Sequence, residues 1–218
     1  MSMNFETARE QMLGQQIRAW EVLDERVLHV LKDTPRELFV PQTERDLAFA
    51  DVEIPLPHGQ CMMYPKVEAR LLQALQIGPA DCALEIGTGS GYLAACMSRL
   101  ADRVTSVEIF PDMSSASAGK FAQLGIENID LEVADALTLT YSKQFDIVAV
   151  TASVPELTQH FIRMLRPHGR LFVVVGRAPI MDARLITLHA DGEWTEVSMF
   201  ETLLTPLVNA EQAEPFVL

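Results

Sequence analysis

The feature that most constrains the fold is a strand, a glycine-rich turn and a helix in direct succession. The apolar run 82–86 contains one acidic residue, Glu85, and three alternate glycines follow it, Gly87, Gly89 and Gly91. Glycines at such positions permit positive φ and let a ligand approach bare main chain at the N-terminus of the next helix. The sequence therefore predicts a strand–turn–helix unit that binds a nucleotide-like cofactor.

The spacing of the turn and the next strand discriminate between kinds of nucleotide. No lysine follows the glycines, so the G-x-x-x-x-G-K-[ST] pattern of ATPases and GTPases is absent. The spacing G-x-G-x-G also differs from the G-x-G-x-x-G of dinucleotide-binding enzymes. Glu108 ends a second apolar run, 104–107, where one carboxylate can accept hydrogen bonds from both hydroxyls of a ribose. Together these segments resemble the first two motifs of class I S-adenosylmethionine-dependent methyltransferases.

Length and composition favour one enzyme domain. The chain has 218 residues, of which 49% are hydrophobic, enough for a sizeable core. We expect a single domain over 1–218, with an N-terminal helical extension and substrate-side loop over 1–80 and a cofactor-binding core over 81–218.

Charge, cysteines and hydropathy exclude several classes of partner. The formal net charge is −13, and the sequence contains no run of Lys and Arg. Nucleic acid is therefore not expected as a binding partner, because phosphate binding relies on clustered cations. The three cysteines lack C-x-x-C spacing and the histidines share no ligand spacing, so we expect no metal. Neither a signal peptide nor a membrane-spanning run is present, and we expect a cytoplasmic protein that is a monomer or a weak homo-oligomer.

The order of elements after the turn predicts the fold class. Strands and helices alternate, as in a doubly wound sheet. Asp191-Gly192 lies between two apolar segments and predicts a hairpin. We expect a Rossmann-like α/β fold with a mostly parallel seven-stranded sheet and a C-terminal antiparallel hairpin; the strand order is implied by the resemblance to class I methyltransferases. The expected strands are 104–107, 129–133, 145–150, 171–175, 183–188 and 195–203, and the expected helices are 112–124 and a segment that starts at 153–156 and ends at 165.

Ordered motifs along nearly the whole chain resemble the protein-L-isoaspartate O-methyltransferase family. They are 15–18, 24–28, 34–41, 57–60, 150–152, 155–156 and 205–208. The resemblance implies transfer of a methyl group from S-adenosylmethionine to the free carboxylate of isoaspartyl residues in damaged proteins, with S-adenosylhomocysteine as product. The acceptor would be a protein or peptide, and possible other small acceptors stay open. A carboxylate is already ionised at neutral pH, so this reaction needs no general base and no metal.

The resemblance also implies a set of cofactor-binding residues at the ends of the first four strands of the core. They are Glu85, Gly87, Thr88, Gly89, Ser90, Gly91, Tyr92, Glu108, Ile109, Asp135, Ala136 and Thr151. Structural roles compete with this interpretation at four of them. Glu85 could be a buried charge satisfied by the amides of the turn, and Glu108 could be an exposed strand end. Asp135 could cap the following loop, and Thr151 could satisfy local backbone.

One departure from the family bears on the acceptor. Where the family usually reads Gly-Gln-Thr-Ile-Ser-Gln-Pro, this chain reads Gly-Gln-Cys-Met-Met-Tyr-Pro over 59–65. Cys61 stands in the threonine place and Met63 in the place of the family's active-site serine. Met cannot donate a hydrogen bond and Cys donates only weakly. We therefore expect this chain to methylate isoaspartyl peptides about tenfold to a hundredfold more slowly than a typical family member. The catalytic residue is unassigned, with Cys61, Met62, Met63 and His58 as neighbouring candidates.

Three functional readings remain at this point. The chain could be a working isoaspartyl methyltransferase, a family member that methylates a different, less polar acceptor, or a non-catalytic binding protein. Retention of Glu85, the three glycines and Glu108 argues against the last. We also expect the segment 58–65 to fold over the carboxyl edge of the sheet, because only there could it influence the reaction.

Overall fold

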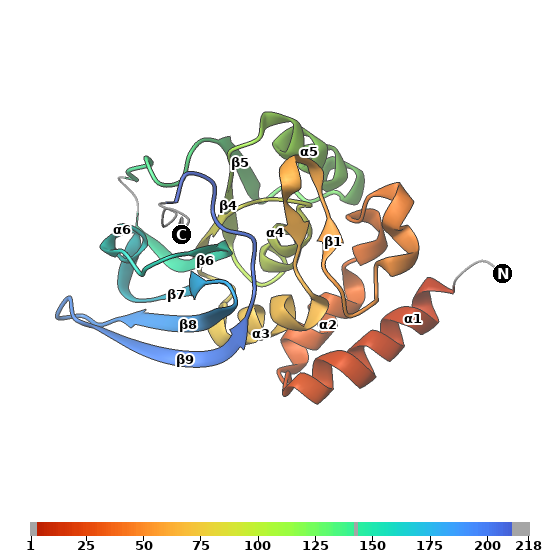
Figure 1. Cartoon of the computed structure of the whole chain (residues 1–218), viewed down its shortest axis with the longest axis horizontal. Coiled ribbons are helices and arrows are strands. Elements are labelled where there is room, and N and C mark those ends of the chain that lie inside the picture. The colour runs from red at the N-terminus through yellow and green to blue at the C-terminus, as the bar shows by residue number, and fades with distance from the viewer. Residues whose placement is uncertain (1–3, 142–143, 211–218) are drawn as a thin grey trace, which may run out of the picture.

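The architecture is an α/β fold built on a seven-stranded sheet. The computed structural model describes residues 4–141 and 144–210 (Figure 1). The strands are β3 (Cys82–Ile86), β4 (Arg103–Glu108), β5 (Ile129–Val133), β6 (Phe145–Val154), β7 (Leu165–Arg177), β8 (Ile180–Leu188) and β9 (Trp194–Thr202). They lie in the order β5-β4-β3-β6-β7-β8-β9. The strands from β5 to β7 in this order are mutually parallel, β8 runs antiparallel to β7, and β9 runs antiparallel to β8. The fold class predicted from the sequence is confirmed.

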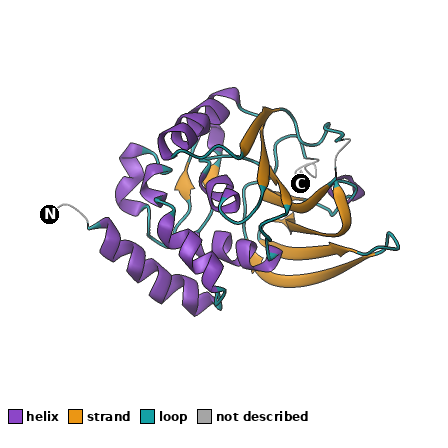
Figure 2. Ribbon diagram, turned by 180° about the vertical axis from the view of Figure 1, so that it is seen from behind, coloured by secondary structure: helices purple, strands orange, loops and turns teal. Residues whose placement is uncertain are grey.

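The two faces of the sheet are covered unequally. Alternate residues of β6 point to opposite sides, so Ile147 joins a cluster with the N-terminal helices while Val148 joins a second cluster. The helices of the first side are α2 (Glu25–Asp33), α3 (Pro65–Leu75), α4 (Tyr92–Ser98) and α5 (Pro111–Leu124). The second side is covered by the short α6 (Gln159–Ile162) and by loops. Most helices thus gather on one side of the molecule, and the β8–β9 hairpin extends on the other (Figure 2).

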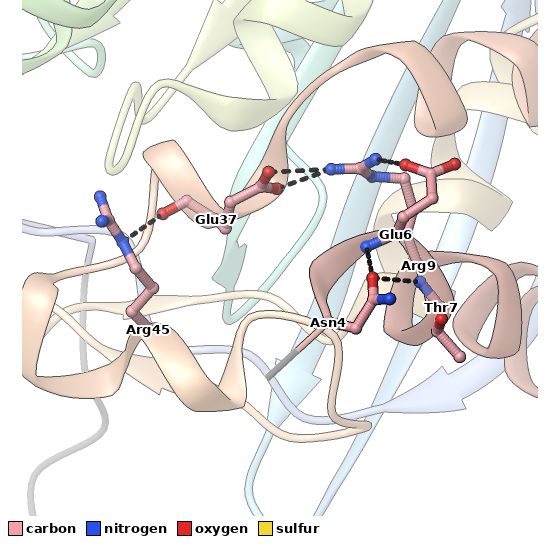
Figure 3. Close-up of polar contacts among 6 residues, drawn as sticks. All are labelled: Asn4, Glu6, Thr7, Arg9, Glu37 and Arg45. Atoms are coloured by element: carbon pink, nitrogen blue, oxygen red, sulfur yellow. Dashed lines mark hydrogen bonds and ion pairs between the residues drawn. The ribbon is translucent and has the colours of Figure 1, made fainter. Parts of the chain in front are cut away.

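The N-terminal extension is mostly helical, as expected. It comprises α1 (Phe5–Gln11), one π-helical turn (Met12–Ile17), α2 and short 3-10 turns at Arg18–Trp20, Arg36–Leu38 and Gln42–Leu47. The Asn4 side chain caps α1 by accepting hydrogen bonds from two backbone amides of its first turn, at 3.1 and 3.2 Å. Arg9 then pairs with Glu37 at 2.9 Å and ties α1 to the 3-10 turn of residues 36–38 (Figure 3).

Two short strands bring the extension back to the main sheet. β1 (Ile54–Pro55) and β2 (Cys61–Met62) pair antiparallel, with Ile54 opposite Met62, and enclose a 3-10 turn, Pro57–Gly59. We call residues 53–63 the lip. α3 follows it directly and packs under β7.

The helix expected between 153 and 165 is wrong in its start and length. Ser153 and Val154 belong to β6, where they pair with Val174 and Val175 of β7. The Ser153 backbone also exchanges hydrogen bonds with Thr205 and Leu207, at 3.0 and 2.8 Å. Since sheet partners satisfy this backbone on both sides, the local helix-start signal is overridden, and only the single turn α6 remains.

The segment 167–169 lies between the expected helix end at 165 and the expected strand 171–175, but the structure places it inside β7. The register with β6 shifts there, because Phe145 faces Leu165 whereas Ile147 faces Arg170. Two expected strands are longer than predicted: 145–150 extends to Val154, and 171–175 extends over Leu165–Arg177. The other expected elements are present with small changes in their ends. In the described residues, no helix has the length and apolar character needed to span a membrane.

Candidate functional site

A crevice opens at the carboxyl ends of the parallel strands. Its volume is about 700 Å³, counting the part open to solvent. Four core segments form its floor: the glycine turn after β3, residues 107–110 at the end of β4, residues 134–136 after β5, and residues 151–152 of β6. The lip covers one side and residues 204–208, after β9, cover the other. Ligands of open α/β sheets bind at this edge.

The first glycine of the turn is held by Thr151. The Thr151 hydroxyl lies 2.8 Å from the Gly87 carbonyl oxygen and 2.9 Å from that of Ile86. Gly87 has a φ of +94°, and a Cβ atom there would collide with this hydroxyl. Thr151 therefore satisfies local backbone, as one alternative anticipated, while it also lines the crevice.

Gly91 and Tyr92, both expected to bind the cofactor, do not line the crevice. Gly91 has a φ of +86°, and a Cβ atom there would meet Ser117 and Phe121 of α5 at 3.0 Å. The Tyr92 ring is buried against Phe39, with the Arg36 guanidinium 4.7 Å from its centroid. Gly91 packs closely against α5, and Tyr92 packs against the N-terminal extension. These contacts give both residues a structural role at the start of α4.

Glu85 lines a smaller recess that adjoins the crevice. The recess has a volume of about 300 Å³ and shares Cys61, Met63, Gly87, Gly89 and Thr151 with the crevice; Thr88 and Ser90 also line it. The Glu85 side chain is fully buried, and burial raises its pKa to about 8.

The hydrogen bonds of Glu85 differ from those anticipated. One carboxyl oxygen accepts a hydrogen bond from the Ser106 hydroxyl, which lies 2.6 Å from that of Thr88. The other oxygen has no partner among the described residues. The amides of the turn therefore do not satisfy this side chain, and one oxygen is available to a donor on a ligand.

Glu108 has the geometry of a receptor for a diol. Its carboxylate is nearly buried and accepts hydrogen bonds from the Gly89 amide at 2.8 Å and the Phe110 amide at 3.1 Å. Each amide uses one carboxylate oxygen, so each oxygen keeps a free lone pair in a fixed direction. Ile109 follows it and also lines the crevice.

Asp135 combines the capping role with a position on the crevice. One oxygen accepts from the Leu137 amide at 2.9 Å, and the other accepts from the Asn209 side chain at 2.8 Å. The hydrogen bond from Asn209 holds the segment after β9 against this end of the crevice. Ala136 lines the crevice and its carbonyl oxygen lies 2.8 Å from Nε2 of His160.

The lip folds over the same edge of the sheet, as expected from the sequence. Cys61 and Met63 line both the crevice and the recess, whereas Met62 lines the recess alone. His58 does not face either space. Its Nε2 lies 2.9 Å from the Asp112 carboxylate at the start of α5, and its ring stacks on Phe110 with centroids 4.1 Å apart.

A buried ion pair braces the lip and was not anticipated. Arg36 is fully buried, donates to the carbonyl oxygens of Ala48 at 2.8 Å and Met63 at 2.9 Å, and forms an ion pair with Glu68 of α3. Burial raises the pKa of Glu68 to about 7, although Arg36 opposes the shift. Both residues lie in segments with a clear helical or motif pattern, but no local pattern signals a contact across 32 positions.

Comparisons with known proteins give a consistent result. The family described as protein-L-isoaspartate(D-aspartate) O-methyltransferase matches residues 7–212. A protein-L-isoaspartate O-methyltransferase of Methanoculleus marisnigri is 39% identical over 80% of each chain. Protein-L-isoaspartate O-methyltransferase 2 of Pelobacter propionicus is 34% identical over 95% of this chain and 93% of its own.

The solved structures show the same fold. A crystal structure described as a protein-L-isoaspartate O-methyltransferase of Plasmodium falciparum, in complex with S-adenosyl-L-homocysteine, superposes with a TM-score of 0.80. It covers 94% of this chain and 99% of its own, at 19% identity.

Proposed function

This chain belongs to the protein-L-isoaspartate(D-aspartate) O-methyltransferase family, and on that premise we propose that it transfers a methyl group from S-adenosylmethionine to isoaspartyl carboxylates in proteins. The observation that carries the proposal is Glu108, a nearly buried carboxylate aimed by two amides at the carboxyl edge of the sheet. A ribose diol would occupy the free lone pairs of Glu108.

The residues around Glu108 fit the remaining parts of the cofactor. Asp135, Ala136 and Ile109 would border the adenine, because they lie beside Glu108 on the crevice. The recess would take the amino-acid end, where the unpartnered oxygen of Glu85 can accept from an ammonium group. Gly89 lines both the crevice and the recess, and its backbone carries no side chain that would keep the cofactor away.

The bound cofactor supplies a methyl group activated by a sulfonium. The chain itself has to align the acceptor oxygen with that methyl and exclude water. Alignment alone can lower the barrier by up to roughly 7 to 11 kcal/mol. Cys61 and Met63 lie where crevice and recess meet, so they would border the methyl group. An ionised acceptor carboxylate needs no base from the protein.

A second acceptor class is favoured by the same two residues. Met63 and Cys61 make the junction of crevice and recess weak in hydrogen-bond donors, which suits an acceptor less polar than a carboxylate. Restoring the hydroxyls with Cys61→Thr and Met63→Ser separates the alternatives. If the acceptor is isoaspartyl, the double variant should act about tenfold to a hundredfold faster on it.

The test of the proposed function is methyl transfer to a matched pair of peptides. One peptide contains isoaspartate and the other contains aspartate at the same position. Methyl ester formed on the isoaspartyl peptide alone, and strongly reduced by Glu108→Ala, is the expected result. Glu127→Gln is the matched control, because Glu127 is an exposed acid before β5, at the opposite edge of the sheet.

A further inference from the structure

The lip contributes to the crevice a carboxylate, that of Glu53, for which the described residues supply no partner. Glu53 lies at the start of the lip, directly before β1, and lines the crevice together with Gln60, Cys61 and Met63. It is half-buried, and burial alone raises its pKa. Within residues 4–141 and 144–210, no hydrogen-bond donor or cation pairs with its side chain.

The other two acids of the crevice are already engaged by the protein. Glu108 accepts from two backbone amides, and Asp135 accepts from Leu137 and Asn209. Glu53 differs because it has lost part of its hydration without gaining a protein donor. A partly desolvated, unpaired carboxylate favours a ligand that brings a positive charge.

The lysine and arginine side chains nearest in sequence contact other groups, and Arg45 donates to the carbonyl oxygen of Glu37 at 3.1 Å. Lys66 lies 2.7 Å from the Asp51 carboxylate and 4.5 Å from the centre of the Trp20 ring. Arg36 is buried against Glu68. His58, the histidine of the lip, contacts Asp112, so neither the lip nor these neighbouring cations neutralise Glu53.

The crevice as a whole has one sign of charge. Its acidic side chains are Glu53, Glu108 and Asp135, and no Lys, Arg or His is among the described lining residues. A substrate segment with acidic flanks would meet like charge here, whereas basic flanks would meet opposite charge.

We propose that Glu53 is a specificity-determining residue that selects acceptors whose residue adjoining the methylated one is positively charged. The ammonium or guanidinium group of that neighbour pairs with the Glu53 carboxylate at the mouth of the crevice. The inference rests on the proposed function, since it takes the acceptor to be an isoaspartyl peptide.

The test compares three isoaspartyl peptides that differ only in the residues on both sides of the isoaspartate. These residues are Lys, Leu or Glu. The ratio kcat/KM should fall in the order Lys, Leu, Glu, with about threefold to fivefold between steps, as expected for a partly exposed charge pair. The difference should appear mainly in KM and should shrink at high salt.

Glu53→Gln keeps the shape of the side chain and removes its charge. It should bring the three values of kcat/KM together, whereas Glu127→Gln should preserve their order. Binding of S-adenosylhomocysteine by each variant verifies its fold. A native enzyme without preference for the Lys peptide, or a Gln variant that keeps the preference, overturns the proposal.

Failure of the proposed function gives a different result. In that case no peptide is methylated by the native protein. The same peptides are then titrated onto the protein saturated with S-adenosylhomocysteine, by fluorescence anisotropy. Tighter binding of the Lys peptide that Glu53→Gln abolishes supports the role of Glu53, and equal or absent binding of all three contradicts it.

Discussion

Arg36 shows how a single residue can organise a site without touching its ligand. Its guanidinium joins three separate segments: the carbonyl oxygen of Ala48, that of Met63, and the carboxylate of Glu68. Met63 is the last residue of the lip, so the position of the lip depends on this contact. Arg36 is therefore a positioning residue.

Replacing Arg36 by Ala should lower the free energy of unfolding by about 3 to 5 kcal/mol, because Glu68 would stay buried without its partner. Urea unfolding measures this. The double variant Arg36→Met with Glu68→Leu should lose much less, since it removes both charges. Equal losses in the two variants would show that packing, rather than the buried charge, sets the effect.

Glu85 should make the stability of the cofactor-free protein depend on pH. Its pKa is about 8 in the folded chain against 4.5 for an unperturbed carboxyl, so the folded state binds the proton more tightly. Its contribution is complete below pH 4.5 and is lost as the pH rises through about 8. In that window the free energy of unfolding should fall by at most about 1.4 kcal/mol per pH unit through this group.

Urea unfolding at pH 5, 6, 7 and 8, compared between the native chain and Glu85→Gln, isolates this contribution. The Gln variant should have the flatter profile, because it cannot ionise. Parallel profiles would mean that the proton affinity of Glu85 is the same in both states.

At the scale of elements, the lip is fastened across the mouth of the crevice. His58 stacks on Phe110 and hydrogen-bonds Asp112 at the start of α5, and the hydrogen bond lowers the pKa of Asp112. This contact holds the lip against the end of β4, where the ribose of the cofactor is proposed to lie. Opening the lip requires that the contact break.

His58→Ala should therefore speed release of S-adenosylhomocysteine by about fivefold, the effect of losing roughly 1 kcal/mol of stacking and hydrogen bonding. Stopped-flow displacement gives the rate. His189→Ala is the matched control, because His189 lies in the turn between β8 and β9. An unchanged rate in His58→Ala would show that the lip opens elsewhere or stays in place.

Helices and strands were predictable from the sequence where the local sequence pattern and the tertiary contacts favour the same structure. The strands 82–86 and 129–133 and the helix ending at Gly125 have strong patterns and appear as expected. The start at 153–156 failed because Ser153 finds backbone partners near 205, which no local signal reveals. Likewise Glu108 was predictable because it ends the apolar run that forms β4. Arg36, Glu53 and the segment 204–208 depend on contacts that form only in the folded chain.

At the scale of the whole molecule, three parts of the chain make one site. The core supplies the glycine turn and Glu108, the extension supplies the lip, and the segment after β9 closes the third side. The segment passes beside β6, where Ser153 pairs with Pro206 (Figure 1). We propose that this shared crevice holds S-adenosylmethionine with its sulfur at the lip.

A crystal structure with S-adenosylhomocysteine bound measures this most directly. Both ribose hydroxyls should donate to Glu108, and the sulfur should lie within about 4.5 Å of the Cys61 or Met63 side chain. A sulfur about 10 Å or more from both side chains, beyond any direct contact, would contradict it.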